Sequence, residues 1–159
     1  MKGASEGVAQ SVSNFGVAYL AVSAAGHLVW EFLQLPLYTI WQRGTAAELA
    51  YAVLHCTIGD VFIAAGSLAV AWAIGSVCRN SESRFSVIAI LAIAIGVGYT
   101  AFSEWHNVYV RGSWAYSAIM PTLSFGKLSI GLSPLLQWIV VPASAMANVH
   151  SRMRQSNAR

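Results

Sequence analysis

The sequence predicts an all-α, polytopic membrane protein whose four transmembrane helices form a single bundle. Of the 159 residues, 57% are hydrophobic and only 9% are charged, whereas soluble domains carry about 25% charged residues. Four apolar stretches each approach or exceed the ~20 residues needed to cross a hydrocarbon core. The basic residues lie mainly at the chain ends and in one short connection. We therefore expect one integral membrane domain covering residues 1–159.

The first span is expected at about 15–35, after a polar lead over residues 1–14 that should be loosely ordered or lie at the interface. Pro36 should end this helix, because proline also disfavours the helical conformation of the residue before it. Aromatic and basic residues follow as an interfacial anchor, namely Tyr38, Trp41 and Arg43.

The second span is expected at about 48–77, which is longer than a perpendicular helix needs and so suggests tilt. The third, at about 85–107, contains Gly96 and Gly98, which should permit close helix contact.

The segment from Gly112 to Lys127 is too short and too interrupted to span a membrane. It should form a re-entrant or interfacial connection between the third and fourth helices. The fourth span is expected at about 128–149, with a kink at Pro142.

Basic residues favour one orientation of this bundle. The side that holds both termini and residues 79–84 carries six of them, and the other side carries three. Cytoplasmic loops are enriched in Lys and Arg, so both termini should be cytoplasmic, and a bacterial inner membrane is the expected location. No basic stripe interleaves with aromatic residues, which argues against a nucleic-acid partner.

A polar stripe runs along the first span. His27, Glu31 and Gln34 fall within about 60° of one another on an α-helix. An ionisable group inside a membrane helix is a functional-site hypothesis by default, because it is costly without a partner.

The other spans add polar groups that should converge on this stripe in the half of the bundle away from the termini. We expect a network, around a cavity open to the outer face, with members from every span. His55 and Asp60 are about 140° apart on an ideal helix. If the third helix continues past residue 107, Glu104, Asn107 and Arg111 should lie on one of its faces. The added groups are His55, Asp60, Glu104, Asn107, Arg111 and Gln137.

These residue types suit proton transfer to a lipophilic molecule. A buried carboxylic acid can protonate a double bond, and aromatic ring faces can stabilise the resulting cation. The expected ligand is isoprenoid- or sterol-like, and the expected reaction is acid/base isomerisation or cyclisation. The candidate catalytic residues are His27, Glu31, Asp60 and Glu104. The candidate ligand-binding residues are Gln34, His55, Asn107, Arg111, Trp30, Trp105, Trp114, Tyr116 and Gln137, of which His55 and Arg111 would orient the catalytic groups.

Other interpretations stay open at this point. The network alone would serve a non-catalytic membrane subunit or ligand-binding module, and a second copy of the chain or another membrane subunit is a further candidate partner. Two histidines and three carboxylates suit a transition metal, but the Glu-x-x-His pairs of di-iron bundles are absent. Matched depth makes His27 and His55 a candidate haem pair. Cys56 and Cys78 lack metal-ligand spacing and are expected to be small buried residues. We predict no metal and no cofactor.

Three short motifs carry a resemblance to a known family. They are His27-Leu-Val-Trp-Glu31 in the first span, Tyr99 followed by Glu104-Trp105-His106 at the end of the third, and Trp114-Ala-Tyr116 before a proline-containing fourth span. Together with the order of spans, they resemble the four-helix EXPERA membrane domain of emopamil-binding sterol isomerases and sigma-2 receptor-type proteins. The resemblance implies a cavity for a sterol-like amphiphile, and proton transfer by acidic and histidine groups. The patch from Gly112 to Tyr116 also resembles a stretch of membrane lycopene cyclases.

Overall fold

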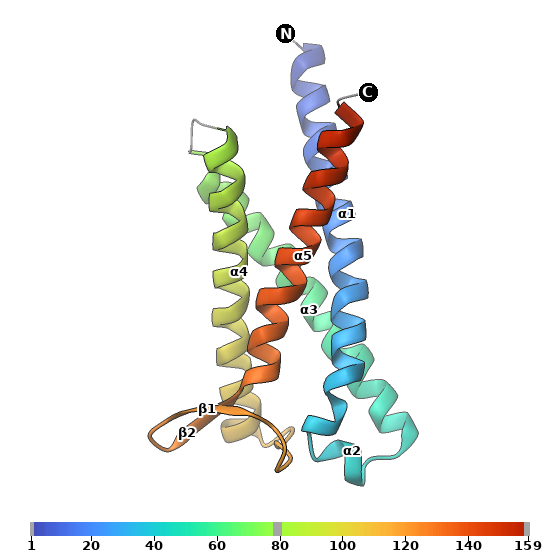
Figure 1. The fold of residues 1–159 in the computed structure, drawn as a ribbon, viewed down its shortest axis with the longest axis vertical. Coiled ribbons are helices and arrows are strands. Elements are labelled where there is room, and N and C mark those ends of the chain that lie inside the picture. The colour runs from blue at the N-terminus through green and yellow to red at the C-terminus, as the bar shows by residue number, and fades with distance from the viewer. Residues whose placement is uncertain (1, 78–80, 158–159) are drawn as a thin grey trace.

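Four long helices lie side by side in the computed structural model, which describes residues 2–77 and 81–157 (Figure 1). They are α1 (Lys2–Gln34), α3 (Ala46–Gly75), α4 (Ser81–Trp105) and α5 (Leu132–Asn157). Within these described residues, four helical stretches are long and apolar enough to cross a membrane: Ser13–Leu37, Ala46–Gly75, Arg84–Arg111 and Leu132–Gln155. The prediction of a bundle of four such helices is confirmed.

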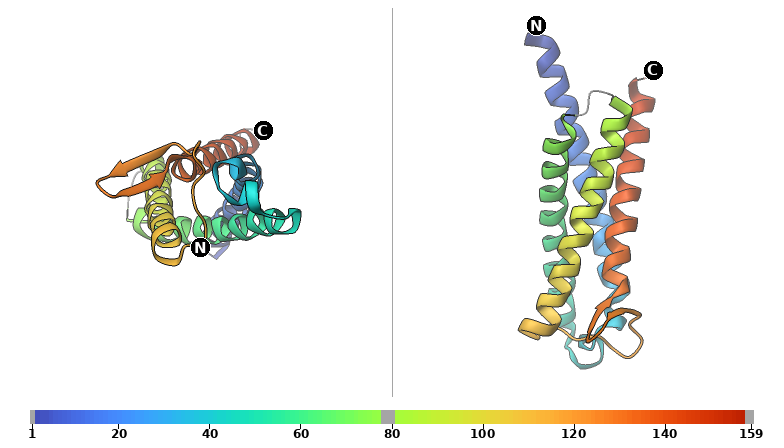
Figure 2. Two further views of the ribbon diagram at one scale, coloured as in Figure 1. Left: turned by 90° about the horizontal axis from the view of Figure 1, so that it is seen from below. Right: turned by 90° about the vertical axis from the view of Figure 1, so that its left-hand side faces the viewer.

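The helices form a closed ring. α1 packs against α3 and α5, and α4 packs against the same two helices from the other side. The end-on view in Figure 2 shows this arrangement. Both termini lie at one end, and the short helix α2 (Ile40–Arg43) and a β-hairpin lie at the other.

Helix ends follow the local chemistry. Pro36 lies in a 3₁₀ turn (Leu35–Leu37) that ends α1, as the sequence predicts. Thr45 begins α3 with a capping box, in which its hydroxyl oxygen accepts the N–H of Glu48 and the Glu48 carboxylate accepts the N–H of Thr45.

The expected loosely ordered lead is wrong, because α1 begins at Lys2 rather than near residue 15. The first proline of the chain is Pro36. Once a helix has formed, each further residue adds one backbone hydrogen bond, so nothing before Pro36 forces an earlier boundary.

A β-hairpin joins α4 to α5, so the chain is not entirely α-helical. Strands β1 (Thr122–Phe125) and β2 (Leu128–Gly131) pair antiparallel through the two-residue turn Gly126–Lys127. Gly126 has φ +62°, a conformation that glycine adopts without steric cost and that suits a tight hairpin turn. Residues 128–131 are therefore strand, and the expected start of the fourth span at 128 is wrong.

The apolar core fills the half of the bundle nearer the termini. Its larger members are Phe15, Tyr19, Leu68, Ile88, Trp138 and Val149. A Cβ atom at Gly96 would lie 2.1 Å from Cε3 of Trp138, so only glycine lets this indole pack against α4. Gly98 has no neighbour within 4 Å at the corresponding position and makes no such contact.

Candidate functional site

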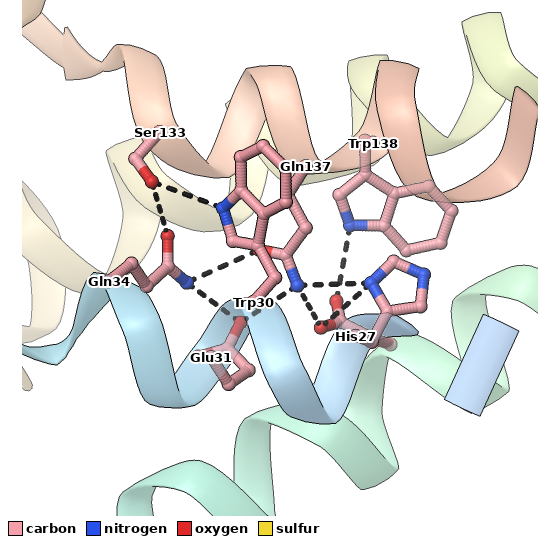
Figure 3. Close-up of polar contacts among 8 residues, drawn as sticks. His27, Trp30, Glu31, Gln34, Ser133, Gln137 and Trp138 are labelled. Atoms are coloured by element: carbon pink, nitrogen blue, oxygen red, sulfur yellow. Dashed lines mark hydrogen bonds and ion pairs between the residues drawn. The ribbon is translucent and has the colours of Figure 1, made fainter. Parts of the chain in front are cut away.

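Eight side chains from α1, α3 and α5 form a polar group that we call the carboxyl cluster, of which Trp30 and Glu31 are half-buried and the rest are buried (Figure 3). Four of these side chains come from α1, one from α3 and three from α5. The period of the α-helix places His27, Glu31 and Gln34 on the inward face of α1. Its members are His27, Trp30, Glu31, Gln34, Asp60, Ser133, Gln137 and Trp138.

Gln137 is the centre of the carboxyl cluster. Its Nε2 atom lies 3.0 Å from Glu31 Oε1, 2.9 Å from Asp60 Oδ2 and 3.0 Å from His27 Nδ1. Its side chain is 1% exposed. Two carboxyl groups and an imidazole therefore converge on one amide nitrogen in the interior of the bundle.

A directed chain of hydrogen bonds fixes how this amide is turned. The Trp30 indole is a donor only, so Ser133 accepts its N–H at 3.2 Å and donates to Gln34 Oε1 at 2.8 Å. Gln34 Nε2 then donates to Glu31 Oε1 at 2.8 Å and to Gln137 Oε1 at 3.2 Å. The Nε2 side of Gln137 must consequently face the carboxyl groups.

Asp60 has further contacts in the carboxyl cluster. The Trp138 indole donates to its Oδ1 at 3.1 Å, and His27 Nδ1 lies 3.5 Å from its Oδ2. The His27 ring packs on Trp138 with centroids 4.9 Å apart.

Glu104 lies in a second polar group with two tyrosines, which we call the tyrosine site. Tyr116 donates to Glu104 Oε2 at 2.6 Å and accepts the N–H of Gly131 at 3.0 Å. The Tyr38 hydroxyl lies 3.4 Å from both Glu104 oxygens. A backbone bridge between Tyr38 and Tyr116 brings the two connections together at this end of the bundle.

The phenol of Tyr38 is influenced by a carboxyl group of each polar site. Burial raises the pKa of Tyr38 well above its ordinary value, and the negative charges of Glu104 and then Glu31 raise it further. The pKa of Tyr116 is raised by burial and by its contact with Glu104. Tyr38 therefore lies within electrostatic reach of one carboxyl group from each polar site.

Three further buried donors make no hydrogen bond of normal length and angle within the described residues. They are Thr57 Oγ1, Thr100 Oγ1 and Trp114 Nε1. Thr57 lies one turn before Asp60 on α3, and Thr100 one turn before Glu104 on α4. Because buried polar groups are almost always paired, Thr57 and Thr100 are available to a polar group of a bound molecule or to water, whereas Trp114 also interacts with Glu104.

His55 does not join either polar site. Its side chain is exposed and stacks on Tyr51, with centroids 5.4 Å apart. The angle of about 140° from Asp60 on an ideal helix puts His55 on the outer face of α3. His55 therefore cannot orient the catalytic groups as expected, and it does not face His27 as a haem pair would require.

The end of the third span also differs from expectation. Residues His106–Arg111 form a π-helical turn, which changes the spacing of side chains around the axis. Asn107 donates to the Ser103 carbonyl oxygen at 2.9 Å, and Arg111 is exposed. Trp105 packs with Phe102 and His106 away from Glu104. The predicted line of Glu104, Asn107 and Arg111 on one face is therefore wrong.

Sequence reasoning left three participants out of the site: Tyr38, Ser133 and Trp138. Ser133 and Gln137 are four residues apart and so share one helix face, which is a signal that could have found Ser133. The sequence predicts Tyr38 as an interfacial anchor, but the turn at Pro36 brings its hydroxyl to Glu104.

No group of three His, Cys, Asp or Glu side chains that could hold a metal ion occurs in the described part of the chain. Cys56 is a half-buried free thiol, and Cys78 lies outside the described residues.

No family model, curated protein or solved structure matches this chain.

Proposed function

We propose that this protein is an integral membrane protein that binds a lipophilic, isoprenoid- or sterol-like molecule between its helices and donates a proton to it. As an enzyme it would be an acid/base isomerase or cyclase. The observation that carries the proposal is the convergence of Glu31, Asp60 and His27 on the amide nitrogen of Gln137.

Hydrogen counting supports a mobile proton in the carboxyl cluster. The two N–H hydrogens of the Gln137 amide can serve Glu31 and Asp60, and the neighbouring His27 Nδ1 can then carry a hydrogen of its own. Two carboxylates on either side of one neutral amide repel each other, and a proton held between them relieves that repulsion. Such a proton, close to an imidazole and shielded from solvent, is suited to general acid catalysis.

The unpaired donors support a bound molecule with a polar end. Thr57 and Thr100 offer hydrogen bonds in the half of the bundle nearer the hairpin, where Glu104 and Tyr38 also lie. An amphiphile with a hydroxyl or carbonyl group could pair with these donors while its apolar body contacts the helices. This arrangement agrees with the proposed likeness to the EXPERA domain.

The membrane setting is part of the proposal. Large apolar side chains are exposed on all four long helices, among them Phe32, Phe62, Ile90 and Val140, as expected for surfaces that face lipid. The excess of basic residues favours both termini on the cytoplasmic side, in a bacterial inner membrane. The hairpin would then lie at the outer interface, where its exposed Leu123, Phe125 and Leu128 contact headgroups.

A structural role is the second candidate, because one observation favours it. Within the carboxyl cluster the side-chain amides of Gln34 and Gln137 both have donors and acceptors matched to neighbouring side chains. A satisfied network of this kind fixes helix packing in a membrane subunit without any chemistry.

Replacement of Glu31 by Gln separates the two candidates. Wild type and variant would be purified in detergent, the molecules that co-purify would be identified by mass spectrometry, and deuterium incorporation into them would be followed in D₂O. Glu48→Gln is the matched control, because Glu48 is exposed and glutamine also suits its capping position.

The proposed function predicts that Glu31→Gln keeps the thermal stability of the control but loses deuterium incorporation or ligand retention. Loss of folding in Glu31→Gln alone, with no lipophilic molecule in the wild-type preparation, would establish the structural role instead.

A further inference from the structure

Three side chains on the inward face of α1 continue the polar stripe away from the carboxyl cluster. Tyr19, Ser23 and His27 follow one another at intervals of four residues, and all three are 0% exposed. The buried atoms Tyr19 Oη, Ser23 Oγ and His27 Nε2 make no hydrogen bond of normal length and angle within the described residues, although the Tyr19 and Ser23 side chains interact with each other. Neither Tyr19 nor Ser23 takes part in the function proposed above.

His27 connects this column to the carboxyl cluster. Its Nδ1 atom is 3.0 Å from Gln137 Nε2 and 3.5 Å from Asp60 Oδ2. Figure 3 shows the other ring nitrogen pointing away from these contacts. One imidazole therefore has a nitrogen at the carboxyl groups and a nitrogen at the column.

The column offers polar atoms to internal water at its lower end. Ser23 and His27 are four residues apart, a rise of about 6 Å along the helix axis, and one water between Ser23 Oγ and His27 Nε2 would give each a hydrogen bond of ordinary length. Buried waters characteristically bridge polar groups that lack protein partners. Hydroxyl groups on either side can both donate to and accept from such a water.

We propose that Tyr19, Ser23 and His27 hold a file of internal water molecules, and that His27 relays protons between this file and the Glu31–Asp60 pair. A water of the file gives a proton to Nε2 as the proton on Nδ1 passes to Asp60 Oδ2. The imidazole ends neutral in its other tautomer, and the proton lost by the file is replaced from bulk water.

The position of the file gives it a direction. It begins at the carboxyl cluster and ends at Tyr19, which stacks on Phe15 with centroids 6.4 Å apart. From Tyr19 to Ser13, where the apolar stretch begins, is about 9 Å of helix. Protons would thus reach the carboxyl groups from the end that holds the termini, opposite the proposed ligand.

Infrared spectroscopy of the purified protein in D₂O tests the relay without any ligand. The absorption of protonated carboxyl groups shifts on deuteration, and the part due to the cluster is assigned by its loss in Glu31→Gln and Asp60→Asn. Ser23→Val, which occupies the space of a water, should slow this exchange by about tenfold or more, and Ser23→Ala should slow it less.

Ser67 provides the matched control. It is 3% exposed, but its hydroxyl already donates to the Ala64 carbonyl oxygen at 3.2 Å. Ser67→Val and Ser67→Ala should leave the exchange rate unchanged.

Three results would overturn the relay: wild-type exchange in folded Ser23→Ala and Ser23→Val, equal slowing in the Ser67 variants, or no protonated carboxyl band in the wild type. The relay depends on the proposed function only for the use of the proton. Unchanged exchange in the Ser23 variants would leave ligand binding and the Glu31→Gln test untouched.

Discussion

The hydroxyl group of Tyr116 donates a 2.6 Å hydrogen bond to Oε2 of Glu104. The Tyr116 hydroxyl oxygen in turn accepts the backbone N–H of Gly131 at 3.0 Å. One phenol thus connects the end of α4, the connection before the hairpin and the last residue of β2. The acidic residue of the predicted third span is therefore held by the segment that the sequence predicts as a re-entrant or interfacial connection.

Tyr116→Phe should lower the free energy of unfolding by about 1–3 kcal/mol, because the Glu104 carboxyl group and the Gly131 N–H both lose a partner. Thermal unfolding in detergent measures the change. Tyr51→Phe is the control, since the Tyr51 side chain is 68% exposed. Equal melting temperatures for the two variants would contradict the structural role of this contact.

Stability should fall at alkaline pH. The pKa values of Tyr38 and Tyr116 are raised in the folded protein, so the two phenols stay neutral when unfolded tyrosines ionise near about pH 10. Their contribution is present below that pH and is lost as the pH rises towards the folded values. The melting temperature should therefore decline above about pH 10 and decline least in the Tyr38→Phe/Tyr116→Phe double variant. Parallel curves for wild type and double variant would refute this explanation.

Gly96→Ala should be far more damaging than Gly98→Ala. A Cβ atom at residue 96 would lie 2.1 Å from the Trp138 ring, whereas nothing lies within 4 Å of one at residue 98. Overpacking should cost about 1–3 kcal/mol or more at Gly96, and alanine should be neutral or slightly favourable at Gly98. Thermal unfolding and tryptophan fluorescence report the effect, and similar behaviour of the two variants would show that Trp138 does not pack here.

Gln137→Leu should be among the most destabilising single changes in the chain. It preserves approximate volume but removes the amide that contacts Glu31, Asp60 and His27. Breaking a buried polar network in this way costs about 3–5 kcal/mol. The comparison is Gln42→Leu, because Gln42 is exposed. Comparable yields and melting temperatures for both variants would mean that the carboxyl cluster is not buried as described.

The helix count and the inward stripe of α1 were accessible from the sequence, because hydrophobic length and a period of 3.6 residues are strong signals. The structure brings His27, Glu31, Asp60 and Gln137 together as that stripe suggests. The outward position of His55 was not accessible, because α3 is apolar on all sides and its pattern does not show which face is buried.

The hairpin was missed for a different reason. Residues 122–131 alternate between polar and apolar types on either side of Gly126, which is a hairpin signal, but the hydropathy of Leu128 and Ile130 favoured assigning them to the fourth helix. The π-helical turn at His106–Arg111 leaves no comparable mark in the sequence. It alone moves Asn107 and Arg111 away from Glu104.

The carboxyl cluster is assembled from both ends of the chain, and this has a consequence for biosynthesis. Glu31 and Asp60 leave the ribosome long before Gln137, the amide that pairs with both of them. In the proposed membrane setting, a nascent chain with only its first three helices inserted would hold two acidic groups in the bilayer without their partner. Insertion of α5 would then complete the fold, and we expect a chain that stalls before it to be recognised by the quality-control proteases of that membrane.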